Sequence, residues 1–221
     1  MKIEGAHLCL VYDRNSDEET FALKDVAIAL NDQGVTGLTG PSGSGKSSLL
    51  YLLSGLRRPT SGTLFYDNRD TDSYTQEEIE NLRRQKFGFI FQRPYLINYL
   101  NVLDNVMVGC VKKNRESEKK ALDLLDRLNL SQQAYRRPHR LSVGQKQKIA
   151  VIRALMNDPE VIFADEPTAS LDQQSAMEVI SVLKMNRQKT AVLIVTHDKS
   201  ILQSTDFQIE LRNGSRIVSR A

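Results

Sequence analysis

The amino-terminal part of the chain alternates between apolar and polar residues, as β-strands do. The alternation covers Lys2–Tyr12 and Phe21–Leu30, and the polar stretch Asp13–Thr20 between them resembles a hairpin loop. A third apolar segment, Val35–Thr39, runs directly into a turn rich in glycine and serine. These patterns predict three strands, the last of which ends at a glycine-rich loop.

The apolar spacing becomes helical after this loop. Ser47–Leu56 has an apolar face of leucines, and the Arg-Arg-Pro sequence at 57–59 ends the pattern. A turn and a strand are expected over Thr60–Tyr66. From about Gln76 to Ala154 the patterns are mostly helical, most clearly over Glu116–Leu128. This middle region is expected to be an inserted helical subdomain.

Strand and helix patterns alternate again in the final third of the chain. The expected elements are strand Val161–Ala164, helix Gln174–Met185, strand Ala191–Val195, helix Lys199–Ser204 and a terminal hairpin that turns at Asn213-Gly214. Alternating strands and helices predict an α/β fold with a mainly parallel sheet covered on both faces. Sheets of this kind bind ligands at the carboxyl ends of their strands.

Composition narrows the possibilities only a little. A chain of 221 residues with 40% hydrophobic residues suits one domain with a real core, and a net charge of +3 gives no case for a nucleic-acid partner. No apolar run approaches the roughly 18 residues that span a bilayer. Glu4 and His7 interrupt the apolar core that a signal peptide needs, so we expect a cytoplasmic protein. Cys9 and Cys110 are assigned no function.

The glycine-rich loop matches a phosphate-binding motif. Residues 40–47 fit the pattern GxxxxGK[ST] between a predicted strand and a predicted helix. Glycines let backbone N–H groups face phosphate oxygens, Lys46 reaches the terminal phosphates, and Ser47 offers a hydroxyl to Mg²⁺. A flexible turn is the alternative, which the flanking elements disfavour. The residues expected to contact the nucleotide here are Gly40, Pro41, Ser42, Gly43, Ser44, Gly45, Lys46, Ser47 and Ser48.

Two carboxylates follow the apolar strand Val161–Ala164. A parallel sheet would place Asp165 and Glu166 beside the phosphate loop. We expect Asp165 to help hold Mg²⁺ and Glu166 to orient or deprotonate an attacking water. An ordinary strand end followed by a turn is the alternative.

The segment Leu141-Ser142-Val143-Gly144-Gln145 resembles the LSGGQ signature of ABC (ATP-binding cassette) ATPases. Lys146–Leu155 is similar to the basic helix that follows the signature in that family, and the resemblance covers essentially the whole chain. An isolated helix-capping serine is the alternative. The resemblance implies a P-loop NTPase (RecA-like) core sheet, an N-terminal antiparallel β subdomain and an inserted α-helical subdomain.

The same resemblance divides the single domain 1–221 into two parts. Residues 1–75 and 155–221 would form the nucleotide-binding core with its β subdomain, and about 76–154 would hold the Q-loop and the helical subdomain. In the family, the signature of one subunit closes over ATP held by the other subunit. The resemblance thus implies a head-to-tail dimer in which Ser142, Gly144 and Gln145 contact ATP in trans, although Val143 replaces a commoner glycine and restricts the backbone.

Further site residues follow from the resemblance one position at a time. Gln92 resembles the Q-loop glutamine, a contact of Mg²⁺ or the attacking water, and His197 resembles the switch histidine that touches the γ-phosphate. Asp172 belongs to a segment like the D-loop, which crosses the dimer interface. Tyr12 is the expected platform for adenine. The alternatives are a surface glutamine, a structural histidine, a helix cap and a packing tyrosine.

The segments 40–47, 58–62, 88–92 and 164–168 look most like those of the ATPases of lipoprotein-release and macrolide-export systems. We therefore expect an ATP-hydrolysing subunit, peripheral on the cytoplasmic face of a membrane, that drives a transmembrane permease on a separate chain. A regulatory or mechanical ATPase of the cell-division type is the alternative, and a soluble DNA-repair or translation ABC protein is a weaker one. Arg93–Val108 resembles the docking surface for the membrane subunit, although its apolar residues Pro94, Tyr95, Leu96, Leu100 and Val106 would also suit a core.

Overall fold

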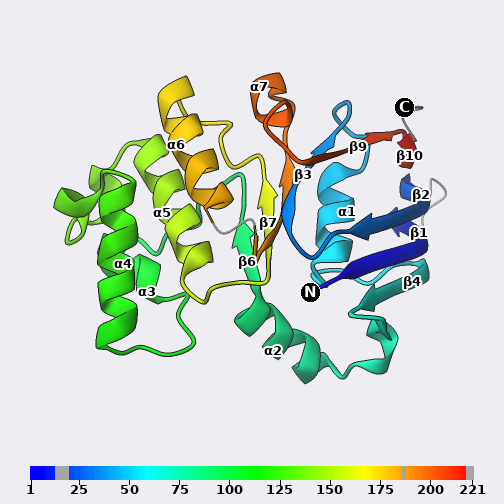
Figure 1. Ribbon diagram of the computed structural model, residues 1–221, viewed down its shortest axis with the longest axis horizontal. Coiled ribbons are helices and arrows are strands. Elements are labelled where there is room, and N and C mark those ends of the chain that lie inside the picture. The colour runs from blue at the N-terminus through cyan, green and yellow to red at the C-terminus, as the bar shows by residue number, and fades with distance from the viewer. Residues whose placement is uncertain (13–19, 186–187, 218–221) are drawn as a thin grey trace.

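Two sheets and their helices form the molecule, as seen in a computed structural model that describes residues 1–12, 20–185 and 188–217 (Figure 1). Most of the expected hairpin loop Asp13–Thr20 lies outside these residues. The helices α3 to α6 gather at one end of the molecule and the smaller sheet lies at the other (Figure 1). The large sheet stands between them, so its strand ends are accessible to both.

The large sheet has the strand order β10-β9-β3-β8-β7-β6. All neighbouring strands in it are parallel except β9 and β10, which form the terminal hairpin. Every residue of β7 and β8 is buried, which explains their continuous apolar sequences. The strands are β3 Gly34–Thr39, β6 Phe87–Ile90, β7 Val161–Asp165, β8 Ala191–Val195, β9 Phe207–Arg212 and β10 Ser215–Ile217.

The small sheet is antiparallel, with the order β2-β1-β4-β5. Its strands are β1 Ile3–Tyr12, β2 Thr20–Leu30, β4 Ser61–Tyr66 and β5 Arg69–Asp70. The backbone N–H of Lys24 in β2 donates to the carbonyl of Gly214 at the terminal hairpin, at 2.8 Å. This contact holds the edge of the small sheet against the end of the large one.

Helices surround the large sheet and contribute to two buried clusters. One cluster joins α1 and the small sheet to β3, β7 and β8, and the other joins α3 to α6 to the large sheet. The helices are α1 Lys46–Leu53, α2 Gln76–Lys86, α3 Val102–Met107, α4 Arg115–Arg127, α5 Val143–Leu155, α6 Gln173–Lys184 and α7 Lys199–Leu202, with 3₁₀ turns η1 Thr71–Ser73, η2 Ser131–Gln133 and η3 Pro138–Arg140. The predicted fold class is confirmed.

The helical pattern expected over 76–154 does not hold throughout. Phe87–Ile90 forms β6, which pairs in parallel with β7 and so belongs to the large sheet. Four residues are too few to show a period, and the polar helix α2 leads directly into them. Phe87 packs edge to face against Phe163 of β7, with ring centroids 5.2 Å apart. Burial of these aromatic rings therefore decides the strand where the local pattern could not.

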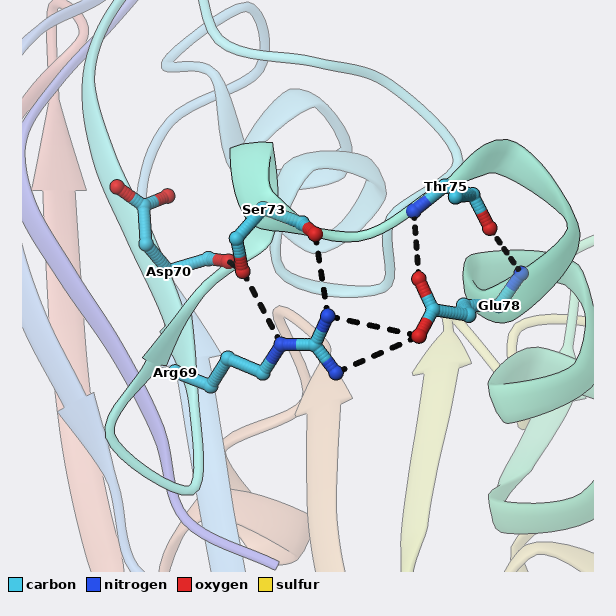
Figure 2. A network of polar contacts seen from close by, with 5 residues as sticks. All are labelled: Arg69, Asp70, Ser73, Thr75 and Glu78. Carbon is cyan, nitrogen blue, oxygen red and sulfur yellow. Dashed lines mark hydrogen bonds and ion pairs between the residues drawn. The ribbon is translucent and has the colours of Figure 1, made fainter.

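A polar network connects the small sheet to α2 (Figure 2). Arg69 donates to the hydroxyl and the carbonyl of Ser73, each at 3.1 Å, and also to Glu78. Thr75 and Glu78 form a reciprocal capping box at the start of α2, with bonds of 3.2 and 2.7 Å. The network fixes the direction in which the chain enters α2.

Candidate nucleotide-binding site

The loop between β3 and α1 needs glycine for two different reasons. Gly40 and Gly45 have φ values of 147° and 95°, which side-chain-bearing residues rarely adopt. A Cβ atom on Gly40 would lie 2.1 Å from the carbonyl oxygen of Leu211, and one on Gly45 would lie 2.3 Å from that of Ala22. The loop can therefore curve tightly only because it packs against β2 and β9 without side chains.

Two polar side chains of this loop face inward. The Lys46 ammonium donates to the carbonyls of Gly40 and Pro41, at 3.0 and 2.8 Å. The Ser44 hydroxyl is buried, and it has no hydrogen-bond partner among the residues that the structure describes. A buried hydroxyl without a partner is costly, so the loop fits a ligand with acceptor oxygens, such as a phosphate.

Asp165 lies at the end of β7 and receives two hydroxyl groups from α1. Ser47 Oγ donates to Oδ1 at 3.2 Å, and the Tyr51 hydroxyl lies 3.5 Å from Oδ2. Burial raises the pKa of Asp165, although both hydrogen bonds and the charge of Lys46 oppose the shift. Burial and the nearby Asp165 charge likewise raise the pKa of Tyr51. Tyr51 was not among the residues expected at the site, and its spacing of four residues from Ser47 on one helix face was the available signal.

Glu166 and His197 come from neighbouring strands and meet beyond the sheet. A hydrogen bond of 2.9 Å joins His197 Nδ1 to Glu166 Oε1. Glu166 has a φ of 49° and its backbone N–H donates to the carbonyl of Val195, so the chain turns sharply after β7. This turn directs the carboxylate of Glu166 toward the phosphate loop, whose cavity it lines.

A cavity of about 430 Å³ brings together residues from both sheets and from α1. It is lined by eleven of the residues expected at the site, namely Tyr12, Ser42, Gly43, Ser44, Gly45, Lys46, Ser47, Ser48, Gln92, Asp165 and Glu166. Four further lining residues were not foreseen, namely Thr20, Phe21, Ala22 and Val195. Three of the four belong to β2, which reaches the loop only through the packing of the small sheet, so no local sequence pattern indicates them.

Tyr12 forms one wall of this cavity at the end of β1. Its hydroxyl is hydrogen-bonded to the Ser48 hydroxyl at 3.2 Å, which ties the ring to the first turn of α1. The position suits an aromatic platform at the edge of the phosphate loop. Gln92 reaches the cavity from the segment after β6, where Gln147 of α5 donates to the neighbouring carbonyl of Phe91 at 3.0 Å.

The signature segment lies apart from the cavity of its own chain. Ser142, Gly144, Gln145 and Asp172 are not among the described residues that line it. Ser142 caps α5 instead, accepting from the backbone of Gln145 at 3.2 Å while Gln145 Oε1 accepts from the backbone of Ser142 at 3.0 Å. Gly40, Pro41 and His197 are also outside the lining, although all three contact residues within it.

Asp172 caps α6 in a similar way. Its carboxylate accepts from the backbone N–H of Ser175 at 2.9 Å, and this hydrogen bond lowers the pKa of Asp172. The amino ends of α5 and α6 therefore both end in an exposed polar side chain, and Val143, at the first position of α5, is 58% exposed. Both helix termini are available to a ligand or to another chain.

The fold and the phosphate loop define a P-loop nucleotide-binding protein with an ABC-type architecture. The family profile described as ABC transporter matches residues 23–169, and the chain belongs to this family. In the described residues no helix is both long and apolar enough to cross a membrane.

Individual relatives sharpen this assignment. The uncharacterized ABC transporter ATP-binding protein MJ1508 of Methanocaldococcus jannaschii is 38% identical over 216 residues, which cover 96% of both chains. The macrolide export ATP-binding/permease protein MacB of Rhodopseudomonas palustris is 42% identical over 203 residues, which cover 90% of this chain but 31% of that relative. The chain thus spans about a third of the length of such export proteins. The expected likeness to macrolide-export ATPases is confirmed.

Solved structures agree with the fold. The dimeric structure of a post-hydrolysis state of the ATP-binding cassette MJ0796, bound to ADP and Pi, superposes with a TM-score of 0.88. It is 33% identical, and the match covers 99% of this chain and 97% of that one. The cbiO1 protein of Clostridium perfringens, part of the ABC transporter complex cbiONQ, has a TM-score of 0.83 at 28% identity over 98% of this chain and 86% of that one.

Proposed function

We propose that the protein hydrolyses ATP to ADP and phosphate to drive a membrane partner. The observation that carries this proposal is the cavity in which the phosphate loop, two strand-end carboxylates and Gln92 converge. Phosphoryl transfer to water depends on placement and charge neutralisation rather than on covalent chemistry by the protein. Lys46 supplies the cation for the terminal phosphates, and the Ser44 hydroxyl, which has no partner in the described part of the chain, supplies a further donor.

Mg²⁺ fits the oxygen atoms that the site offers. Ser47 and Asp165 present a hydroxyl and a carboxylate 3.2 Å apart, and both are the hard oxygen ligands that Mg²⁺ prefers. In the parts of the chain that the structure covers, no group of three or more His, Cys, Asp or Glu side chains is arranged so that it could hold a metal ion. A Mg²⁺ ion held by few protein ligands takes the remainder from phosphates and water, where it neutralises developing charge.

Glu166 is the proposed acceptor of the proton from the attacking water. Its carboxylate lines the cavity, and its hydrogen bond to His197 holds one oxygen while the other stays available. A charged or polar neighbour of this kind orients a general base without replacing it. His197 is exposed, with 77% of its side chain accessible, and it is the proposed contact for the γ-phosphate.

The complete site is proposed to form only between two copies of the chain. Ser142 and Gly144 lie outside their own cavity at the exposed amino end of α5, where partial positive charge favours an anion. A head-to-tail pair would bring this end to the phosphate loop of the partner. The cassette MJ0796, which is similar in fold over nearly the whole chain, is dimeric, and this supports pairing of two copies.

Replacement of Glu166 by glutamine tests the proposal. Glu166→Gln should lower ATP turnover by about 10²- to 10⁴-fold, because a general base is lost, while ATP affinity is retained. With Mg²⁺ and ATP, the variant should elute as a stable dimer in gel filtration. Glu118→Gln, an exposed change in α4, is the matched control and should behave as wild type. Undiminished hydrolysis by Glu166→Gln would remove Glu166 from this role.

A membrane subunit is proposed to dock beside Gln92, which would place the protein on the cytoplasmic face of a membrane. Tyr95 and Tyr99 are 66% and 77% exposed, whereas Val106 of α3 is fully buried and belongs to the core. Arg153 of α5 donates to the carbonyls of Pro94 and Tyr95, at 2.8 and 3.0 Å, and so connects this surface to the signature helix. Exposed aromatic residues are typical of interfaces. Co-purification with membranes, lost on changing Tyr95 and Tyr99 to serine, would test it.

A further inference from the structure

Arg57 lies against the ring of Tyr12 from outside the nucleotide cavity. Its guanidinium carbon is 4.8 Å from the ring centroid, within the range of a cation–π contact. Tyr12 lines the phosphate-loop cavity, and Arg57 is absent from the described lining of that cavity. Arg57 instead lines a separate hollow with Leu56 and Arg58, just after α1. Arg57 therefore contacts the Tyr12 ring without lining the nucleotide cavity.

Tyr12 is held at two further points, its hydroxyl and its backbone. Its hydroxyl is hydrogen-bonded to Ser48 Oγ at 3.2 Å, and its backbone pairs with Thr20 at the end of the small sheet. Ser48 is in the first turn of α1 and Arg57 follows the end of this helix. One short segment of chain thus provides both the phosphate loop's helix and the two side chains that orient the ring.

We propose that Arg57 is a positioning residue for the base of the nucleotide, acting through Tyr12. The inference rests on the proposed ATP-binding function. Arg57 holds the tyrosine ring so that adenine stacks on the face opposite the guanidinium, giving a three-layer stack of base, ring and cation. Arginine suits this place because its planar group stacks on an aromatic face, which a lysine ammonium does less well.

Two physical effects would strengthen stacking of the base. A ring that is already fixed loses little conformational freedom when the base binds, so less of the binding free energy is spent on ordering it. The cation on one face also polarises the ring electrons toward itself, which favours contact of the other face with an electron-rich base. Neither effect requires Arg57 to touch the nucleotide.

The test compares ATP with inorganic tripolyphosphate, which has the phosphates but no base. Arg57→Ala should raise the Kd for ATP by about two- to five-fold, the size of an exposed cation–π contact. Its Kd for tripolyphosphate should not change, because the phosphate loop is intact. Arg58→Ala removes the same charge from the next residue and is the control; it should bind both ligands as wild type does.

A double-mutant cycle with Tyr12→Ala completes the test. If Arg57 acts through the ring, Arg57→Ala should have no further effect on the Kd for ATP once Tyr12 is replaced. An equal loss of tripolyphosphate binding, an equal loss in the Tyr12→Ala background, or an unchanged Kd for ATP would each overturn the inference. Arg57→Gln, which keeps a planar polar group without charge, replaces Arg57→Ala should the latter unfold.

Failure of this inference is distinguishable from failure of the proposed function. A wild-type protein that binds neither ATP nor tripolyphosphate would contradict the proposed function itself. A wild-type protein that binds both, together with an Arg57→Ala variant indistinguishable from it, would contradict only the role of Arg57.

Discussion

The phosphate loop and the signature segment are both short glycine-containing motifs at the start of a helix, yet the structure treats them differently. The phosphate loop lies in a cavity with partners from two sheets, and its Ser44 hydroxyl is buried with no hydrogen-bond partner among the described residues. The signature lies at the exposed amino end of α5, a helix that is otherwise mostly buried, and its polar groups cap one another. Two motifs that are equally clear in the sequence can thus differ in the structure, because one forms most of a binding site and the other forms only one wall of it.

The difference gives the two motifs separate tasks. The phosphate loop has the interior surroundings that bind a nucleotide within one chain, whereas the signature can act only on something that approaches from outside. The exposed amino end of α5 supports the proposed dimer on physical grounds, because its donors lie outside the cavity of their own chain and suit an anion held by another chain.

The largest effect, on ATP binding, is expected from Lys46 of the phosphate loop. Lys46→Ala removes the cation facing the phosphates and should weaken ATP binding by about 100-fold, corresponding to about 3 kcal/mol for a charge-assisted contact. Isothermal titration of ATP measures it. Lys119→Ala, which removes an exposed lysine of α4, is the control. If Lys46→Ala still bound ATP with the nanomolar to micromolar affinity of the wild type, the loop would not be the phosphate site.

The next effect tests whether the signature works in trans. Ser142→Arg should block hydrolysis by obstructing the amino end of α5, and Lys46→Ala should block it at the loop. Mixed dimers of the two variants contain one intact composite site, so mixing should restore roughly a quarter of the wild-type ATPase rate if chains pair at random. A mixture no more active than the two variants measured separately would argue that each chain completes its own site.

Asp165 is expected to give opposite signs for stability and for activity. Because burial raises its pKa, the ionised form costs folding free energy, and this cost is present above the folded-state pKa and disappears as the pH falls below the unfolded one. Asp165→Asn should therefore raise the melting temperature of the nucleotide-free protein by about 2–4 °C at pH 7 while abolishing Mg²⁺-dependent hydrolysis. The gain should shrink at acidic pH. A lower melting temperature at pH 7 would contradict this interpretation.

The sequence predicted most accurately what local chemistry decides. The terminal hairpin turns at Asn213 and Gly214, which both have positive φ, as an Asn-Gly turn requires. The phosphate loop likewise lies between a strand and a helix, because its glycines decide the local backbone conformation. In contrast, the contacts of Tyr51 with Asp165 and of Arg57 with Tyr12 depend on how distant elements pack. The strand Phe87–Ile90 was missed because four residues carry no measurable period.

The smallest effect is expected in a region where the polar groups serve the fold alone. The network of Figure 2 resembles the signature in having a capping box, Thr75 with Glu78, but it is tied to Arg69 within the same chain. The hydrogen bond from the Thr75 backbone lowers the pKa of Glu78. The stability that this bond gives to the folded state is therefore present above the unfolded-state pKa of Glu78 and is lost as the pH falls through the folded-state pKa.

Thr75→Ala should lower the melting temperature by about 2–4 °C, the usual cost of a lost helix cap, and leave the ATPase rate unchanged. Thermal melting and a hydrolysis assay on the same sample measure both quantities. Ser142→Ala removes the corresponding cap of α5. There the main effect should be on the ATPase rate and not on the melting temperature, with a larger loss of activity than Thr75→Ala causes. Equal losses of activity in the two variants would mean that the signature cap, like the cap of α2, only supports its helix.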